Sequence, residues 1–193
     1  MADKLLKKRA EEHIGLANAL LADEKLQGLV EDAAQRIIAC YRKGGKVILM
    51  GNGGSAAEAQ HMAAEFLGKF LLERKALPAI ALTANSSTMT AIANDSEFAA
   101  VFRRQLEAWA AKEDVVIGIS TSGNSQNVVE GLKEAKSRGI FTIGLVGEKK
   151  CSIDDVCDLC LKIPSSSTPR IQEMHTLIMH TICEEVEAAL AKA

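Results

Sequence analysis

The chain has 193 residues, of which 48% are apolar and 25% are charged. This composition is enough to bury one core and leave an ordinary solvated surface, so we expect a single domain over residues 1–193. The formal net charge of -2 provides no basic surplus of the kind that nucleic-acid binding uses. Aromatic residues make up only 4% and there are 3 prolines, which excludes an all-β fold of short strands.

The chain carries no recognisable targeting segment. Its first residues are charged from Asp3 onward, without the apolar stretch of a secretory signal, and no later stretch has the ~20 apolar residues that span a bilayer. We therefore expect a cytoplasmic protein that does not bind membranes. Five cysteines, an odd number, predict reduced thiols there. Cys157 and Cys160 form a C-x-x-C, but no second pair completes a zinc site, so we expect both to be buried core residues.

The apolar pattern predicts two N-terminal helices followed by alternating strands and helices. Apolar residues at helical spacing run from Leu5 to about Arg42 and end at a pair of glycines. The later short runs are apolar throughout, which predicts strands buried on both faces, and helices between them predict right-handed crossovers. The predicted fold class is therefore α/β, a doubly wound parallel sheet flanked by helices. The predicted strands are 46–50, 79–83, 115–120, 141–146 and 159–163, and a last helix spans about 170–191.

Ligands bind such sheets beyond the carboxyl ends of the strands, and two predicted strand ends carry suitable residues. The turn GNGGSAAEAQ (51–60) allows close backbone approach and leads to a helix start at Ser55, although glycine-rich turns are often only turns. The segment STSGNS (120–125) places four hydroxyl groups in six residues directly before a helix. Helix capping explains one hydroxyl but not four, so this segment predicts a site for an anion such as phosphate.

Two predicted helices carry groups suited to proton transfer or metal binding. His61 and Glu65 lie four residues apart on a helix predicted over 55–70, which places them on one face. Gln172 and His180 share a stripe of the last helix. These four groups suit either an acid/base site or a metal site of mixed ligands. Taken alone, an i, i+4 pair is usually a surface contact, and glutamine is an unusual zinc ligand.

The motifs MGNGGSAAEAQHMAAEF, AIANDSEF, ISTSGNSQNV and RIQEMHTLIMH resemble the sugar isomerase (SIS) domain family in order and separation, most closely its phosphoheptose isomerases. The resemblance covers nearly the whole chain. STSGNS marks phosphosugar-binding domains in general, whereas H-x-x-x-E together with Gln172 and His180 points to the isomerases. The resemblance implies a five-stranded parallel SIS domain with N-terminal helices. It also implies a homotetramer with active sites between subunits, which binds a small sugar phosphate.

The resemblance assigns roles to individual residues. It implies that Glu65 and His180 are the catalytic acid/base pair. It also implies zinc, one ion per subunit, bound by His61, Glu65, Gln172 and His180. The implied substrate-binding residues are Asn52, Gly53, Gly54, Ser55, Glu65, Asn94, Asp95, Ser120, Thr121, Ser122, Ser125 and Gln172.

The implied reaction is the conversion of D-sedoheptulose 7-phosphate to D-glycero-D-manno-heptose 7-phosphate, the first step towards the heptose of lipopolysaccharide or other surface glycans. It proceeds through an enediol and needs no redox cofactor. A carboxylate suits the proton on carbon, and an imidazole, with an ordinary pKa of ~6.5, suits the protons on oxygen. The chain departs from the family at Lys69, where arginine is common, and at Pro169, where some members have an acidic residue.

Two alternatives stay open. One is a non-catalytic regulatory member of the same family, of the DnaA initiator-associating type. The other is an isomerase of a different phosphosugar, which would share STSGNS but need not share His61, Glu65 and Gln172. A regulator has no reason to keep both Glu65 and His180, and this sequence keeps both.

Overall fold

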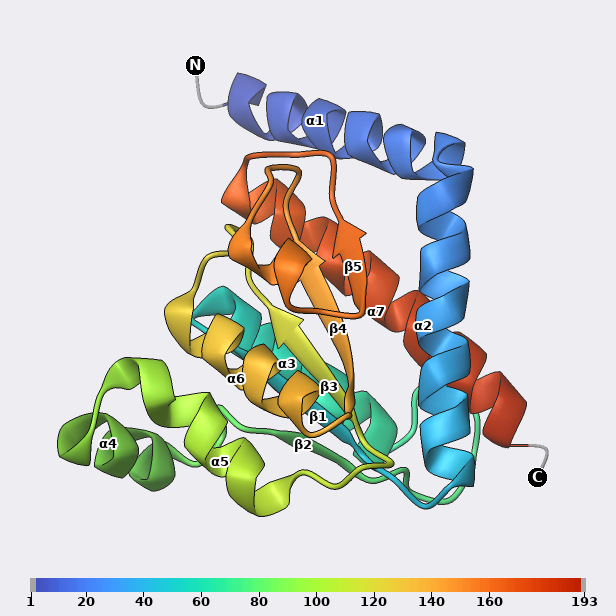
Figure 1. Cartoon of the computed structure of the whole chain (residues 1–193). Helices are drawn as coiled ribbons and strands as arrows, with labels where there is room; N and C mark the ends of the chain where they lie inside the picture. The colour runs from blue at the N-terminus through green and yellow to red at the C-terminus, as the bar shows by residue number, and fades with distance from the viewer. Residues whose placement is uncertain (1–2, 192–193) are drawn as a thin grey trace.

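The computed structural model describes residues 3–191 and contains one five-stranded sheet with helices on both faces (Figure 1). The chain begins with two helices, α1 (Asp3–Ala22) and α2 (Glu24–Arg42). They meet at Asp23, whose carboxylate accepts the N–H of Leu26 and so caps the start of α2. This pair of helices confirms the prediction made from the apolar spacing.

All strands are parallel and follow the order β2-β1-β3-β4-β5. The predicted parallel α/β sheet is therefore confirmed. Burial on both faces is confirmed for the central strands, but it is wrong for the edge strands β2 and β5, where Ile80 and Lys162 are half-exposed. The helices leave the outer rows of the sheet partly uncovered. The strands are β1 (Val47–Gly51), β2 (Ala79–Ala81), β3 (Val115–Ile119), β4 (Phe141–Val146) and β5 (Leu159–Lys162).

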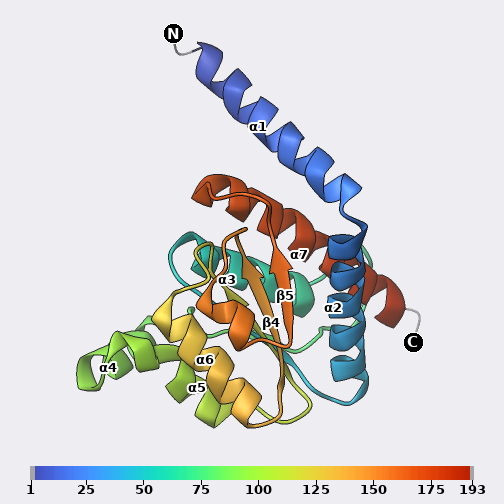
Figure 2. The same ribbon diagram turned by 45° about the horizontal axis from the view of Figure 1, so that its top comes forward.

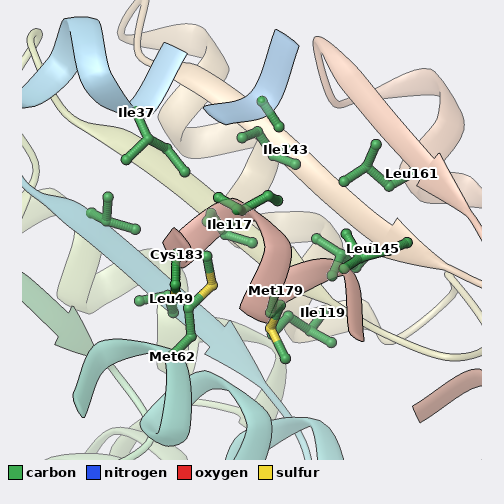
Figure 3. Close-up of a cluster of buried hydrophobic side chains, with 14 of the residues drawn as sticks. Ile37, Leu49, Met62, Ile117, Ile119, Ile143, Leu145, Leu161, Met179 and Cys183 are labelled. Carbon is green, nitrogen blue, oxygen red and sulfur yellow. The ribbon is translucent and has the colours of Figure 1, made fainter. Parts of the chain in front are cut away.

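Two apolar clusters fill the space between the sheet and its helices. One face packs on α2, α3 and α7, the other on α5 and α6 (Figure 1), while α1 extends away from this body (Figure 2). Figure 3 shows the first cluster, where Leu49 and Ile117 of the sheet lie close to Met62 and Met179 of the helices. This packing fixes α3 and α7 side by side on the sheet. The helices after α2 are α3 (Gly54–Leu67), α4 (Ser86–Asp95), α5 (Val101–Trp109), α6 (Gln126–Ser137) and α7 (Thr168–Leu190).

The five cysteines are free thiols. Cys157 is buried as expected, whereas Cys160 is half-buried and donates its thiol to a carboxylate oxygen of Asp154 at 3.3 Å. Full burial of both was therefore wrong for Cys160, because it lies on the exposed row of edge strand β5. None of the helices within residues 3–191 is long and apolar enough to cross a membrane.

The strand order places a crevice between β1 and β3. From β1 the chain moves outward to β2, then returns past β1 to form β3 on its other side. Connections that leave in opposite directions open a crevice outside the carboxyl ends of the two strands, and ligands of doubly wound sheets bind there. The glycine-rich turn follows β1 and STSGNS follows β3, so the fold brings both predicted binding segments to this crevice.

Candidate active site

The hydroxyl groups of 120–125 face one another instead of capping the helix that follows. The Ser120 hydroxyl is buried and lies 3.0 Å from the Ser125 hydroxyl and 3.4 Å from that of Ser122. Ser125 is the N-cap residue of α6, yet its side chain makes no capping hydrogen bond. Hydroxyls gathered before the free amides of a helix start can bind an anion. The geometry therefore favours the anion interpretation of this segment over capping.

Gly123 determines the shape of this loop. Its φ of +66° lies in the left-handed region that favours glycine. A methyl group at this position would lie 2.1 Å from the Cys151 sulfur. The Gly123 N–H donates to the Ser120 hydroxyl at 3.1 Å, which helps to fix the hydroxyl cluster.

A pair of amides joins the two loops at the crevice. Asn52 and Asn127 exchange hydrogen bonds of 2.8 and 2.9 Å between their side chains, and Asn127 is buried. Gln172 reaches the same turn from α7, since a methyl group on Gly54 would lie 2.2 Å from its amide nitrogen. Asn127 was not among the site residues predicted from the sequence. Its only signal was a polar residue on the apolar face of a predicted helix.

A pocket of about 220 Å³ lies beside the hydroxyl cluster. Thr121 and Ser122 form one wall, and Lys149 and Lys150 contribute to the others. The two lysines were not predicted from the sequence, because hydroxyls and helix amides can bind an anion without them. Ser55, predicted at the start of α3, is buried there.

The histidine and carboxylate groups of α3 and α7 form a second polar cluster. The His61 Nε2 lies 2.9 Å from a Glu65 carboxylate oxygen and 3.4 Å from the His180 Nε2. One ligand atom from each of the three residues lies within 4.8 Å of the other two. The cluster is open, because the His61 side chain is 47% exposed and that of Glu65 is 21% exposed. The structure thus brings the two predicted catalytic residues together through His61.

The donor set of this cluster fits a metal ion. Two imidazole nitrogens and one carboxylate oxygen are ligands that zinc prefers. Two ring N–H groups cannot point at each other, so the facing Nε2 atoms of His61 and His180 need at least one unprotonated nitrogen, which is also the form that binds metal. Gln172, the fourth predicted ligand, lies eight residues before His180, about 12 Å along the helix axis. Its amide packs on Gly54, at the glycine-rich turn.

Asn94 and Asp95 are on an element that contributes to neither cluster. Asn94 and Asp95 are at the end of α4, on the left of Figure 1, and the Asn94 amide donates to the Asp95 carboxylate at 2.8 Å. Lys69 pairs with Glu73 on the surface after α3. Pro169 lies in the first turn of α7, where its missing N–H costs the helix no hydrogen bond.

A parallel α/β domain with a hydroxyl cluster at its strand-order reversal and a His–Glu–His cluster between two of its helices is typical of the phosphosugar-binding class of proteins. The family model described as "SIS domain" matches residues 15–147. The phosphoheptose isomerase of Pelobacter propionicus is 55% identical over 162 residues, 84% of this chain and 86% of that protein. That of Aneurinibacillus thermoaerophilus is 46% identical over 185 residues, 96% of this chain and 93% of that protein.

Solved structures agree with these relatives. The phosphoheptose isomerase structure from Neisseria gonorrhoeae matches with a TM-score of 0.91 at 37% identity, covering 97% of this chain and all of that one. The chain belongs to the SIS domain family, among the phosphoheptose isomerases. The resemblance read from the motifs is thereby confirmed.

Proposed function

We propose that this chain is an aldose–ketose isomerase that converts D-sedoheptulose 7-phosphate to D-glycero-D-manno-heptose 7-phosphate, the first step of heptose precursor synthesis for surface glycans. The observation that carries the proposal is the convergence of Glu65 and His180 on His61 from two different helices. Relatives that cover most of the chain at about half identity are named phosphoheptose isomerases, which supports the choice of sugar.

The hydroxyls of 120–125 hold the phosphate in this proposal. Their clustering before the first turn of α6 supports the assignment. Lys149 and Lys150 line the neighbouring pocket together with Glu148, so the two lysines outnumber the one carboxylate there. The phosphate does not react, so its binding energy serves to align the carbons at the other end of the sugar. Asn52, Gly53, Gly54, Ser55 and Gln172 contact the sugar from the glycine-rich turn.

The proton transfers fall to the second cluster. Glu65 takes the proton from C1 of the ketose, which forms the enediol, and returns it to C2. His180 moves the second proton from the C1 hydroxyl to the C2 oxygen as the new carbonyl forms at C1. No electron leaves or enters the molecule. Ligand atoms of Glu65 and His180 lie within 4.8 Å of each other, which supports this division because both groups can reach neighbouring carbons of one sugar.

The same cluster would hold one zinc ion per subunit, through His61, Glu65 and His180. Gln172, the fourth ligand that the resemblance implies, packs on Gly54 in this structure and would have to turn from there toward the ion. Zinc, when bound, polarises a carbonyl or hydroxyl oxygen of the sugar as a Lewis acid. A carboxylate bound to zinc is a poorer base than a free one, so Glu65 would take the proton from carbon only while it is released from the ion.

We also propose that the protein is a cytoplasmic homotetramer whose active sites lie between subunits. An enediol site has to exclude water, whereas His61 is open in the single chain. Asn94 and Asp95 lie on α4, which contributes to neither cluster, and a neighbouring subunit would bring them to the sugar. Large apolar side chains stand exposed on α1, with Leu6 at 79% and Leu21 at 77%, which supports a covered surface.

The decisive experiment is turnover by the purified protein on a panel of ketose phosphates of five, six and seven carbons. We expect D-sedoheptulose 7-phosphate to be isomerised with the highest kcat/KM. Faster turnover of a shorter ketose would support the alternative that this chain isomerises a different phosphosugar. Binding of sugar phosphates without any turnover would support the regulatory alternative, and light scattering of the same sample measures the oligomer.

A further inference from the structure

The segment 68–77 between α3 and β2, called here the α3–β2 strap, is fastened to α7 by a buried carboxylate. Glu187 is 1% exposed and accepts the backbone N–H groups of Phe70, Leu71 and Leu72 at 2.9, 2.6 and 2.8 Å. The Arg74 Nε lies 3.0 Å from the same carboxylate. Three consecutive amides and a guanidinium around one buried anion fix the path of the strap.

Arg74 connects the strap to the backbone of the proposed base. Its guanidinium donates to the Glu65 carbonyl at 2.7 Å, to that of Phe66 at 2.9 Å and to that of Gly68 at 3.2 Å. Glu65 and Phe66 lie in the last turn of α3, where carbonyls have no partner within the helix, and a cation there also complements the helix dipole. The Phe66 carbonyl also accepts the N–H of Leu77 at 3.0 Å. The Arg74–Glu187 pair therefore fixes the last turn of α3, from which the Glu65 side chain projects.

Phe70 connects the strap to the proposed acid. Its ring is stacked on the His180 imidazole with centroids 5.3 Å apart and an interplanar angle of 30°. The other neighbour of His180 is His61, which meets it edge to face at 5.0 Å. The imidazole plane of His180 is thus set by one ring from the strap and one from α3.

We propose that the α3–β2 strap is a positioning element for the acid/base pair. Phe70 sets the ring plane of His180, Arg74 sets the backbone at Glu65, and Glu187 fastens both. This inference rests on the proposed isomerase function, since it assigns the strap to the residues of that reaction. Phe70, Arg74 and Glu187 act through Glu65 and His180 and do not themselves transfer protons.

Kinetics of ring variants test the proposal. Phe70→Leu keeps apolar bulk but removes the ring, and Phe70→Tyr keeps the ring. Misplacement of a catalytic group by a fraction of an ångström lowers the rate of the chemical step, so we expect Phe70→Leu to lower kcat roughly ten- to a hundredfold with KM within twofold. We expect Phe70→Tyr to stay within about threefold of the parent kcat, because it restores the stacked ring.

Phe141→Leu is the matched control. Phe141 is also half-buried, but it is the first residue of β4 and so lies at the amino end of the strands, opposite the crevice. The Arg36 guanidinium lies over its ring. This variant should lose similar stability in a thermal melt without losing kcat. Equal losses of kcat in Phe70→Leu and Phe141→Leu, or a Phe70→Tyr variant no better than Phe70→Leu, would overturn the positioning role.

A spectroscopic measurement keeps this test independent of turnover. The chain has 4 histidines, so protein labelled with ¹³C-histidine gives few ring signals, and His180→Gln identifies the relevant one. Stacking on Phe70 shields the His180 ring protons, and Phe70→Leu should shift them downfield while Phe141→Leu leaves them in place. An unmoved His180 signal overturns the inference. A shifted signal in a protein that isomerises no ketose phosphate would overturn the proposed function but not the contact.

Discussion

The two ends of the candidate site are built in different ways. The hydroxyl cluster lies within six consecutive residues, and its Ser120 is 4% exposed with its hydrogen bonds made inside the loop. The acid/base cluster joins His61 to His180, which are 119 residues apart, and its members face solvent. The proposed anion binding is therefore a local property of one strand end. Proton transfer depends on how two helices pack.

The helix packing that supports the acid/base cluster contains polar groups of its own. His175 is fully buried on α7, and its Nδ1 lies 3.8 Å from a carboxylate oxygen of Glu58 on α3. At this distance the two groups are not hydrogen-bonded, and neither carboxylate oxygen of Glu58 has a hydrogen-bond partner within the described residues. The polar contacts that hold the end of α3 to α7 are therefore those of Glu187, which accepts three amides of the segment after α3.

The largest expected effect comes from removing the proposed base. Glu65→Gln keeps the shape of the side chain but cannot accept a proton from carbon, so kcat for sedoheptulose 7-phosphate should fall at least about 100-fold. The phosphate end is separate, so sugar-phosphate binding measured by calorimetry should survive. Turnover within tenfold of the parent would contradict the role of Glu65.

The next prediction concerns the metal content of the acid/base cluster, which the phosphate end of the site should not share. Protein purified without chelator should contain about one zinc per subunit by elemental analysis. His61→Ala removes the ligand that contacts both partners and should lose the ion, whereas Gln172→Ala should retain part of it, because a neutral amide is a weak zinc ligand. The fold should survive removal of the ion by chelator. Full occupancy in His61→Ala would show that the cluster serves proton transfer alone.

The contacts of Glu187 with the α3–β2 strap should make the free energy of unfolding depend on pH. Burial raises the pKa of Glu187, but the N–H groups of the strap and the charge of Arg74 outweigh it, so the pKa lies below its ordinary value. A lowered folded-state pKa stabilises the fold fully above the unfolded value of about 4.3, and this contribution is lost as the pH falls through the folded value.

Glu187→Gln should therefore lower the free energy of unfolding by about 3 kcal/mol at pH 7, as expected for breaking a buried ion pair. Urea titrations of parent and variant at pH 7 and at decreasing pH below 4 measure the difference, which should shrink at acid pH. If the difference in unfolding free energy between parent and variant stayed constant across this range, the charge of Glu187 would not contribute to stability.

The contrast between the two ends also explains what could be predicted from the sequence. The strands and the hydroxyl segment were predictable because apolar runs and a turn before a helix are local patterns. The i, i+4 spacing of His61 and Glu65 was visible, and residue chemistry suggested a shared site with His180, but only the resemblance assigned a role to each. Asn127 and the Arg74–Glu187 pair were not predicted, since their partners are distant in sequence. The apolar helix face was a local sign for Asn127 alone.

The smallest expected effect belongs to the phosphate end, and it tests whether that end is only a binding device. Ser120→Ala combined with Ser125→Ala removes the two hydroxyls that face each other at 3.0 Å. Each hydrogen bond to a charged group contributes about 1.5–3 kcal/mol, but backbone amides and other hydroxyls remain, so we expect KM to rise about tenfold. The phosphate takes no part in the proton transfers, so kcat should change less than threefold.

Ser137→Ala is the control, because its hydroxyl donates to a helix carbonyl at the far end of α6. An unchanged KM in the double variant would return these serines to a role in shaping the loop, and a fall in kcat at constant KM would show that the two ends of the site are not separable.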